Sequence, residues 1–426
     1  MHLSLIENIA LSLLVLLLPS QLGFHFWPNW TFVNGIRIDY LSPVIYAVDI
    51  PLLVLLLIQP IRLLALAQRR KDRFLHPRLL LLLASLLLFA SLNISVSGSP
   101  FLATTKWLYA GKLLLFAHYI SNHEFSVKVI SLILPLSLIW SSLLGLSQFH
   151  FQRSLGGGWY WLGERSFSST TPGIALGNYP LRPLSRLEFT TKLRPYSTFS
   201  HPNSLAGFLL VAIILIWKNK TWLSHLAIAL ASLTLIISLS KTAIIIGVGL
   251  LFYHLFTAKI RTGNRIPAWI IMLFSILIIF LSTLQTTSLS ANESIAKRLN
   301  LIAPTVRIIR SSPFLGVGAG GFIPTLFRCC AVLGSGFDLF LQPVHNIYLL
   351  TASELGVPFL LAVLLMAHRQ AALLQSSRNQ TLLFAVAAIF LTGFLDHYWL
   401  TLPQNNLLLS LVIGMVWSEN SGRLTI

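Results

Sequence analysis

The chain has 426 residues, of which 55% are hydrophobic and only 10% are charged, and its formal net charge is +18. Soluble domains carry roughly 25% charged residues, so this composition excludes an ordinary soluble globular protein. Apolar runs of about 20 residues, the length that crosses a bilayer, recur along the whole chain. The sequence therefore predicts an all-α, polytopic membrane protein that forms a single integral membrane domain over residues 1–426.

Counting the apolar runs predicts about twelve transmembrane helices. The first, from Leu5 to about Pro19, lacks the basic residues and the cleavage site of a signal peptide, so we interpret it as a membrane helix. Two later spans are nearly fused through Ser238-Leu239-Ser240. The spans are expected to begin near Leu5, Pro43, Leu79, Phe101, Ser126, Asn203, Trp222, Lys241, Ile266, His345, Thr381 and Pro403.

Lysine and arginine in short loops stay on the cytoplasmic side, and this rule orients the chain. Both termini are expected on that side. Two long loops, residues 151–201 and 285–344, are then expected on the outer side. The clusters that set this orientation are Arg69-Arg70-Lys71-Asp72-Arg73, Lys218-Asn219-Lys220, Lys259-Ile260-Arg261 and His368-Arg369.

Both long loops carry more basic than acidic residues. A basic outer surface favours an anionic ligand or anionic lipid headgroups, whereas the alternative is a solvated loop face. The basic residues are Arg153, Arg165, Arg182, Arg186, Lys192 and Arg194 in the first loop, and Lys297, Arg298, Arg307, Arg310 and Arg328 in the second.

The first loop ends in the string Arg194-Pro-Tyr-Ser-Thr-Phe-Ser-His201-Pro-Asn203, which leads into an apolar span. Asn203 is a candidate N-cap of that helix, and a purely structural role is equally open for His201. A guanidinium near the membrane entrance usually has a partner, so Arg194 is a candidate ligand for an anion. Lys241, which opens a later span, could bind phosphate as a point charge or simply extend to the surface.

In the second loop, Leu299, Ile302, Val306 and Ile309 recur at helical spacing, which predicts an amphipathic segment on the membrane. Arg298 and Arg310 on this segment could hold a ligand or form its solvated face. The glycine-rich string 316–321 matches G-x-G-x-x-G only formally, because no strand or βαβ unit surrounds it. It could offer N–H groups to an anion, or be a tight bend.

His345-Asn346 lies where the second loop enters an apolar run. Histidine can exchange a proton near neutral pH, so His345 is the candidate catalytic base beside a bound anion, with a polar interface residue as the alternative. Glu354 lies inside this span, where a carboxylate is costly and usually has a partner, and Asp396-His397 and Asp49 are weaker cases of the same kind.

Several kinds of site have no support in the sequence. There is no H-E-x-x-H string, no P-loop and no acidic cluster suited to magnesium. Two cysteines cannot complete a four-ligand zinc site, so Cys329 and Cys330 are interpreted as incidental free thiols.

Together the local strings resemble the O-antigen ligase and O-antigen polymerase family of bacterial envelope glycosyltransferases. Besides the Arg194 string, they are Ser238-Leu-Ser-Lys-Thr242, Lys297-Arg298-Leu through Ser312-Pro-Phe-Leu-Gly-Val-Gly318, and His345-Asn346 with nine residues before Gly356. The last is the most specific. The resemblance extends over roughly the whole chain and is tightest from Arg194 to Pro358.

The resemblance implies a GT-C type membrane fold in the bacterial cytoplasmic membrane, with an active site that faces outward. It implies transfer of a glycan from an undecaprenyl-diphosphate carrier to a hydroxyl of a glycan, lipid or protein, without metal or other cofactor and without nucleic acid. His345 matches the family's essential histidine, and Arg298 matches an arginine that holds the diphosphate. Lys241 stands where the family usually has a second arginine, which keeps the charge but loses the two-pronged geometry. The remaining candidates for substrate binding are Arg194, Arg310, Asn346, His201 and Asn203.

A transporter or flippase for an anionic lipid-linked glycan is the alternative from another class. It would be expected to place charged residues at mid-membrane in several spans, whereas this chain gathers its cations in the outer loops. A family member that binds the carrier without turnover also stays open because of Lys241.

Overall fold

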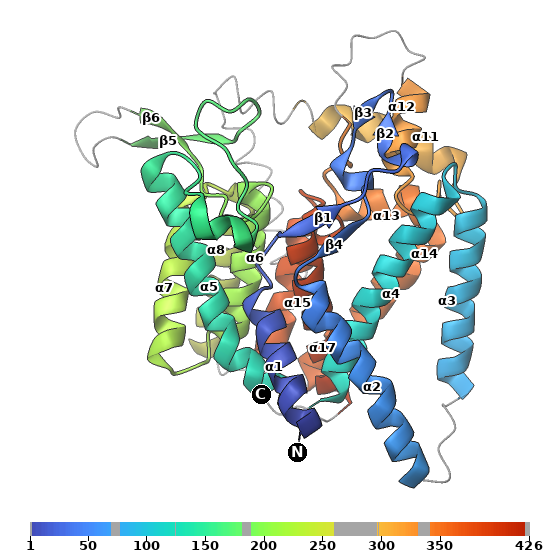
Figure 1. Ribbon diagram of the computed structural model, residues 1–426, viewed down its shortest axis with the longest axis horizontal. Coiled ribbons are helices and arrows are strands. Elements are labelled where there is room, and N and C mark those ends of the chain that lie inside the picture. Colours follow the sequence, from blue (N-terminus) through green and yellow to red (C-terminus); the bar gives the residue numbers. More distant parts are fainter. Residues whose placement is uncertain are drawn as a thin grey trace.

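The computed structural model is predominantly helical, with three short two-stranded sheets (Figure 1). It describes residues 2–69, 77–123, 125–180, 189–259, 296, 298–330 and 341–421. The span expected near Ile266, the basic residues 70–73, 182, 186 and 297, and the stretches 285–295 and 331–340 of the second loop lie outside the described residues.

Most of the expected spans are helices. Within the described residues, Lys128–Phe151 and Val357–Ser376 are long and apolar enough to cross a membrane, and shorter apolar helices of 10–17 residues accompany them. The helices are α1 His2–Leu16, α2 Asp49–Arg69, α3 Pro77–Ser95, α4 Pro100–Asn122, α5 Phe125–Phe151, α6 Pro202–Ile216, α7 Trp222–Ile237, α8 Lys241–Lys259, α13 Ile347–Leu355, α14 Val357–Ser376, α15 Gln380–Gly393 and α17 Pro403–Asn420.

Two expected spans differ from the structure. The span predicted from Pro43 begins instead at Asp49, because Val44–Tyr46 forms a strand and the Asp49 carboxylate accepts the N–H of Tyr46 at 3.0 Å. The single span predicted from His345 is two helices, α13 and α14, which meet at Gly356. Gly356 has a φ of +86°, and the following N–H, of Val357, leaves the helix to bond the carbonyl of Pro313.

Most of the short strands and short helices lie toward one end of the molecule, whereas the start of α1 and the end of α17 lie at the opposite end (Figure 1). The short elements are the antiparallel pairs β1 Gly23–His25 with β4 Val44–Tyr46, β2 Phe32–Val33 with β3 Ile36–Arg37, and β5 Leu176–Pro180 with β6 Phe189–Leu193, together with η1 Asn29–Thr31, η2 Asp39–Leu41, η3 Gly157–Leu162, α11 Ile302–Ser311, α12 Phe322–Cys330 and α16 Tyr398–Thr401. The described parts of the two long loops are therefore folded, and they share one face with the hairpins near the N-terminus.

Helix α17 lies at the centre of the helical layer and packs against α4, α6, α14 and α15 (Figure 1). Its close approach to α4 requires a glycine, because a Cβ at Gly414 would lie 2.6 Å from the carbonyl oxygen of Ala117. Trp399, Phe199 and Phe208 are fully buried in the same core, just below the end that carries the loops. This core fixes the ends of α6 and α15, between which the candidate site lies.

The glycine-rich string 316–321 is a tight bend that surrounds a carboxylate of the protein itself. The N–H groups of Gly320 and Phe322 donate to the two oxygens of Glu354, and the N–H of Gly318 donates to its backbone carbonyl. Asn93 adds bonds to the carbonyl of Glu354 and to the N–H of Ala319. The predicted bend is thus found, and its N–H groups bind the end of α13 rather than an external anion.

The amphipathic segment predicted around residues 299–309 is α11, but a different face of it is buried. Leu301 and Ile308 pack into the core beneath the loops, whereas Leu299 and Ile302 are exposed. These exposed apolar side chains point away from the core, and the contact with a membrane predicted for them stays a prediction.

Candidate functional site

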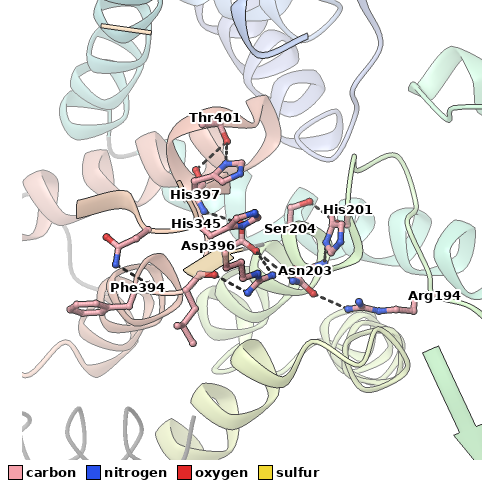
Figure 2. A network of polar contacts seen from close by, with 12 residues as sticks. Arg194, His201, Asn203, Ser204, His345, Phe394, Asp396, His397 and Thr401 are labelled. Carbon is pink, nitrogen blue, oxygen red and sulfur yellow. Dashed lines mark hydrogen bonds and ion pairs between the residues drawn. The ribbon is translucent and has the colours of Figure 1, made fainter. Parts of the chain in front are cut away.

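Four segments that lie far apart in the sequence meet at the loop end of the molecule (Figure 2). They are the end of the first long loop with the start of α6, the helical residues just before α11, the two residues before α13, and the link between α15 and α16. Each contributes polar side chains to one connected cluster. The cluster contains Arg194, His201, Asn203, Arg298, His345, Asp396, His397 and Thr401.

The buried carboxylate of Asp396 is the junction of this cluster. Its Oδ1 accepts the backbone N–H of His397 at 2.9 Å and lies 3.4 Å from Nδ1 of His345. Its Oδ2 accepts from the Asn203 amide at 3.4 Å and lies 3.8 Å from a guanidinium nitrogen of Arg298. Oδ1 thus faces the His345 imidazole, and Oδ2 faces the Arg298 guanidinium.

The neighbours of Asp396 keep it ionised. Burial acts to raise its pKa, but His345 and Arg298 outweigh that effect and hold the pKa well below its usual range. An ionised carboxylate can only accept, so at 3.4 Å from Nδ1 of His345 it favours the tautomer whose proton is on Nδ1. The other ring nitrogen, Nε2, then has its lone pair available.

Asn346 places His345 beside Asp396. Its side-chain oxygen accepts the N–H groups of Tyr348 and Leu349, which makes it the N-cap of α13. Its amide nitrogen donates to the carbonyl of Phe394 at 3.0 Å, at the end of α15. The structure therefore gives Asn346 a positioning contact between two helix ends.

His397 is the second imidazole of the cluster. Its ring centroid lies 4.9 Å from that of His345, and its Nδ1 lies 2.7 Å from the hydroxyl of Thr401. Burial lowers the pKa of His397 to about 3, although the charge of Asp396 acts in the opposite direction. His397 is therefore neutral at physiological pH.

Arg194 joins the cluster through Asn203. Its Nη2 donates to the side-chain oxygen of Asn203 at 2.8 Å, and its Nε donates to the carbonyl of Ser238 in the turn between α7 and α8 at 2.6 Å. Burial lowers the pKa of Arg194 to about 10, so the guanidinium stays charged at neutral pH. The sequence predicted that this arginine has a partner, and the partners found are an amide oxygen and a backbone carbonyl.

The N-cap of α6 is His201, so the prediction that Asn203 caps this helix is wrong. Nδ1 of His201 accepts the N–H of Asn203 at 3.1 Å. Pro202 follows the cap at the first helical position, and Asn203 is therefore already inside the first turn, where its side chain can reach Arg194 and Asp396. Desolvation by its neighbours and the charge of Arg194 lower the pKa of His201.

Arg298 also reaches the cluster, whereas two other predicted cations have no recorded contact with it among the described residues. Nη1 of Arg298 donates to the carbonyl of Leu395 at 3.2 Å, and 30% of its side chain is exposed. Lys241 is exposed at the start of α8, beside the turn that binds Arg194. Arg310 is exposed on α11.

A metal ion would find three possible ligands here, because one ligand atom from each of His345, Asp396 and His397 lies within 4.8 Å of the others. The Arg298 guanidinium, 3.8 Å from the same carboxylate, opposes a divalent cation at that place. With Arg194 and Arg298 positive and Asp396 negative, the cluster carries a surplus positive charge that favours an anion.

Asp396 and His397 were not among the principal site candidates. The only local signal was an acidic residue next to a histidine between two apolar runs. Their partners come from α6, the residues before α13 and the helical residues just before α11, and such contacts between distant segments have no signature in a single sequence.

The family model for O-antigen ligases matches residues 226–364. The matched segment contains Lys241, Arg298 and His345, whereas Arg194, Asn203 and Asp396 lie outside it. No curated protein sequence matches the chain. Over this segment the chain therefore matches the O-antigen ligase family that its sequence strings resemble, which supports the resemblance.

Proposed function

We propose that this protein transfers a glycan from an undecaprenyl-diphosphate carrier to a hydroxyl group of an acceptor, at the outer face of the bacterial cytoplasmic membrane. The match of residues 226–364 to O-antigen ligases supports glycan transfer of this general kind. The site lies at the end of the molecule opposite the start of α1 and the end of α17 (Figure 1), which agrees with the outward orientation predicted from the short basic loops.

The diphosphate of the donor binds on the guanidinium side of Asp396. Arg298 keeps an exposed surface there, and Arg194 is connected to the same carboxylate through Asn203. Guanidinium groups match the geometry of phosphate oxygens with two parallel N–H bonds. Lys241, next to the carbonyl that binds Arg194, adds a further positive charge at the rim.

His345 is the general base. Its Nδ1–H faces Oδ1 of Asp396, so Nε2 accepts the proton of the acceptor hydroxyl. The hydroxyl oxygen forms a bond to the anomeric carbon of the donor. The bond from that carbon to the diphosphate oxygen breaks, and both electrons leave with the polyprenyl diphosphate. The anomeric configuration is inverted.

Positive charge at the leaving group takes the part that a divalent metal plays in many sugar transferases. The diphosphate gains negative charge in the transition state, and guanidinium groups that are already in position stabilise it without reorganisation. Asp396 holds these guanidiniums and the imidazole in one frame, so the two halves of the reaction are aligned.

The observation that carries the proposal is the Asp396 carboxylate between His345 and Arg298. The test uses purified protein in proteoliposomes with a polyprenyl-diphosphate disaccharide as donor. His345→Ala is expected to lower the transfer rate by about a hundredfold to ten-thousandfold, the usual contribution of a general base. Arg298→Ala is expected to be similarly impaired.

Arg307→Ala is the matched control, because this arginine lies on α11 with an exposed side chain. It is expected to transfer at nearly the wild-type rate. Transfer by His345→Ala or Arg298→Ala at the rate of this control would contradict the proposal. Movement of the donor across the bilayer without glycan transfer would favour a flippase instead.

A further inference from the structure

The carboxylate of Asp396 divides the site into two sides, and only one of them suits the diphosphate. Arg298 and Asn203 approach Oδ2, and Asn203 leads on to Arg194. The imidazole of His345 and the backbone of His397 approach Oδ1. A hydroxyl that gives its proton to His345 must therefore come to the imidazole side.

Tyr40 forms the outer wall of the imidazole side. Its ring stands at 80° to the ring of His397, with the centroids 5.6 Å apart. Its backbone carbonyl accepts from Lys106 at 2.7 Å, which fixes the short helix η2 against α4. Burial and the charge of Asp396 raise the pKa of Tyr40, so its phenol is a neutral hydroxyl that can donate a hydrogen bond.

Arg165 comes from the first long loop and binds the backbone next to His201. Its Nη2 donates to the carbonyl of Ser200 at 2.9 Å, while the side chain stays exposed. Its charge acts on the pKa of Tyr40 in the direction opposite to that of Asp396. Both contacts recorded for the guanidinium within the described chain use Nη2, so its other N–H groups can serve a ligand.

We infer that Tyr40 and Arg165 bind the acceptor sugar and hold its hydroxyl beside His345. This inference rests on the proposed function and assigns the acceptor to the imidazole side of Asp396. The ligand that fits is a sugar ring with free hydroxyl groups, which can accept from the phenol and the guanidinium and can donate to a carboxylate.

Asp39 argues against a second diphosphate position at this wall. Asp39 precedes Tyr40 in η2, and its carboxylate is exposed. Its negative charge acts to raise the pKa of both Tyr40 and Arg165. A negative side chain at that place repels a diphosphate, whereas the hydroxyl groups of a sugar can donate to it. A phenol, a guanidinium and a carboxylate together are suited to an uncharged, hydroxyl-rich ring.

The test measures KM for each substrate separately in proteoliposomes. The donor is a polyprenyl-diphosphate disaccharide, and soluble methyl hexopyranosides serve one by one as acceptors. Tyr40→Phe keeps the ring against His397 and removes only the hydroxyl, so it is expected to raise the acceptor KM about threefold to tenfold. Arg165→Gln removes a charged donor and is expected to raise it about tenfold or more. The donor KM is expected to stay within about twofold of the wild-type value in both variants.

Two matched controls come from the same loop. Tyr160→Phe and Arg153→Gln remove the same groups from exposed side chains, and both are expected to leave the acceptor KM unchanged. The inference is overturned if Tyr40→Phe and Arg165→Gln match these controls, or if the donor KM rises instead. Wild-type protein that transfers no glycan to any acceptor would overturn the proposed function, and the acceptor site with it.

Discussion

At the scale of single residues, the site depends on one carboxylate that joins a candidate base to candidate anion ligands. His345 and Arg194 were predicted from strings that lead into apolar spans, and Arg298 was predicted from the amphipathic segment of the second long loop and from the family resemblance. Asp396 could not be given its place in the same way, since its partners come from three other segments. Its role follows only from the folded arrangement.

Substitution of Asp396 by asparagine separates orientation of the base from donor binding. In Asp396→Asn the side chain keeps its shape, but an amide can donate to Nδ1 of His345 and so favours the tautomer whose Nε2 carries a proton and cannot act as a base. We expect kcat to fall about a hundredfold or more while the donor KM changes little. Steady-state kinetics in proteoliposomes measure both. A raised donor KM with an unchanged kcat would show that Asp396 serves the donor site alone.

His201 was predicted as a substrate ligand or a structural residue, and its hydrogen bond to the N–H of Asn203 favours the second role. Asparagine is a good N-cap, whereas alanine cannot accept this bond. We therefore expect His201→Ala to lose about 1 kcal/mol of stability, and His201→Asn to keep both stability and transfer. Thermal unfolding and transfer assays on the two variants check this. Loss of transfer in His201→Asn with unchanged stability would assign the ring to the substrate.

At the scale of elements, α13 follows the candidate catalytic histidine, His345, and is itself held at both ends. Asn346 caps its start and bonds to the carbonyl of Phe394. The glycine-rich bend holds its end through the carboxylate and carbonyl of Glu354. The sequence predicted a bend from the glycines, but the acceptor of its N–H groups could not be predicted, because Glu354 lies in α13, 34 residues after Gly320.

Gly316 is the position at which this bend is most sensitive. Its φ is +66°, and a Cβ there would lie 2.3 Å from the carbonyl carbon of Glu354. A left-handed backbone with a side chain costs roughly 1–2 kcal/mol, and the clash adds to it, so Gly316→Ala is expected to lose at least about 2 kcal/mol of stability. Unfolding measurements in mild detergent test this. Gly158→Ala, where no atom lies within 4 Å of the added Cβ, is the control. Equal stability of the two variants would contradict the role of the bend.

At the scale of the whole molecule, hydropathy predicted where most described helices lie, because burial in a core or a bilayer demands long apolar runs. It missed the break at Gly356 and the strand before Asp49, since both depend on pairing with distant backbone. The burial that builds the helical core also encloses the site. It surrounds His397 with the apolar ends of α15 and α16 and keeps that ring neutral.

This buried neutral imidazole predicts how stability depends on pH. The pKa of His397 is about 3 in the folded protein, whereas an unfolded histidine has a pKa of about 6.5. Between these values the unfolded chain binds a proton that the folded chain does not, so acidification favours unfolding, by up to about 1.4 kcal/mol per pH unit. From pH 7 to pH 5 the wild type is expected to lose about 2 kcal/mol more than His397→Gln.

Asp396 does not contribute in this window. The stability that its depressed pKa provides is lost only when the pH falls below the ordinary aspartate pKa of about 3.9. Other histidines, such as His25 and His201, are present in both proteins and cancel in the comparison. Unfolding midpoints in mild detergent at the two pH values measure the difference, and parallel pH profiles would show that His397 is not held neutral by burial.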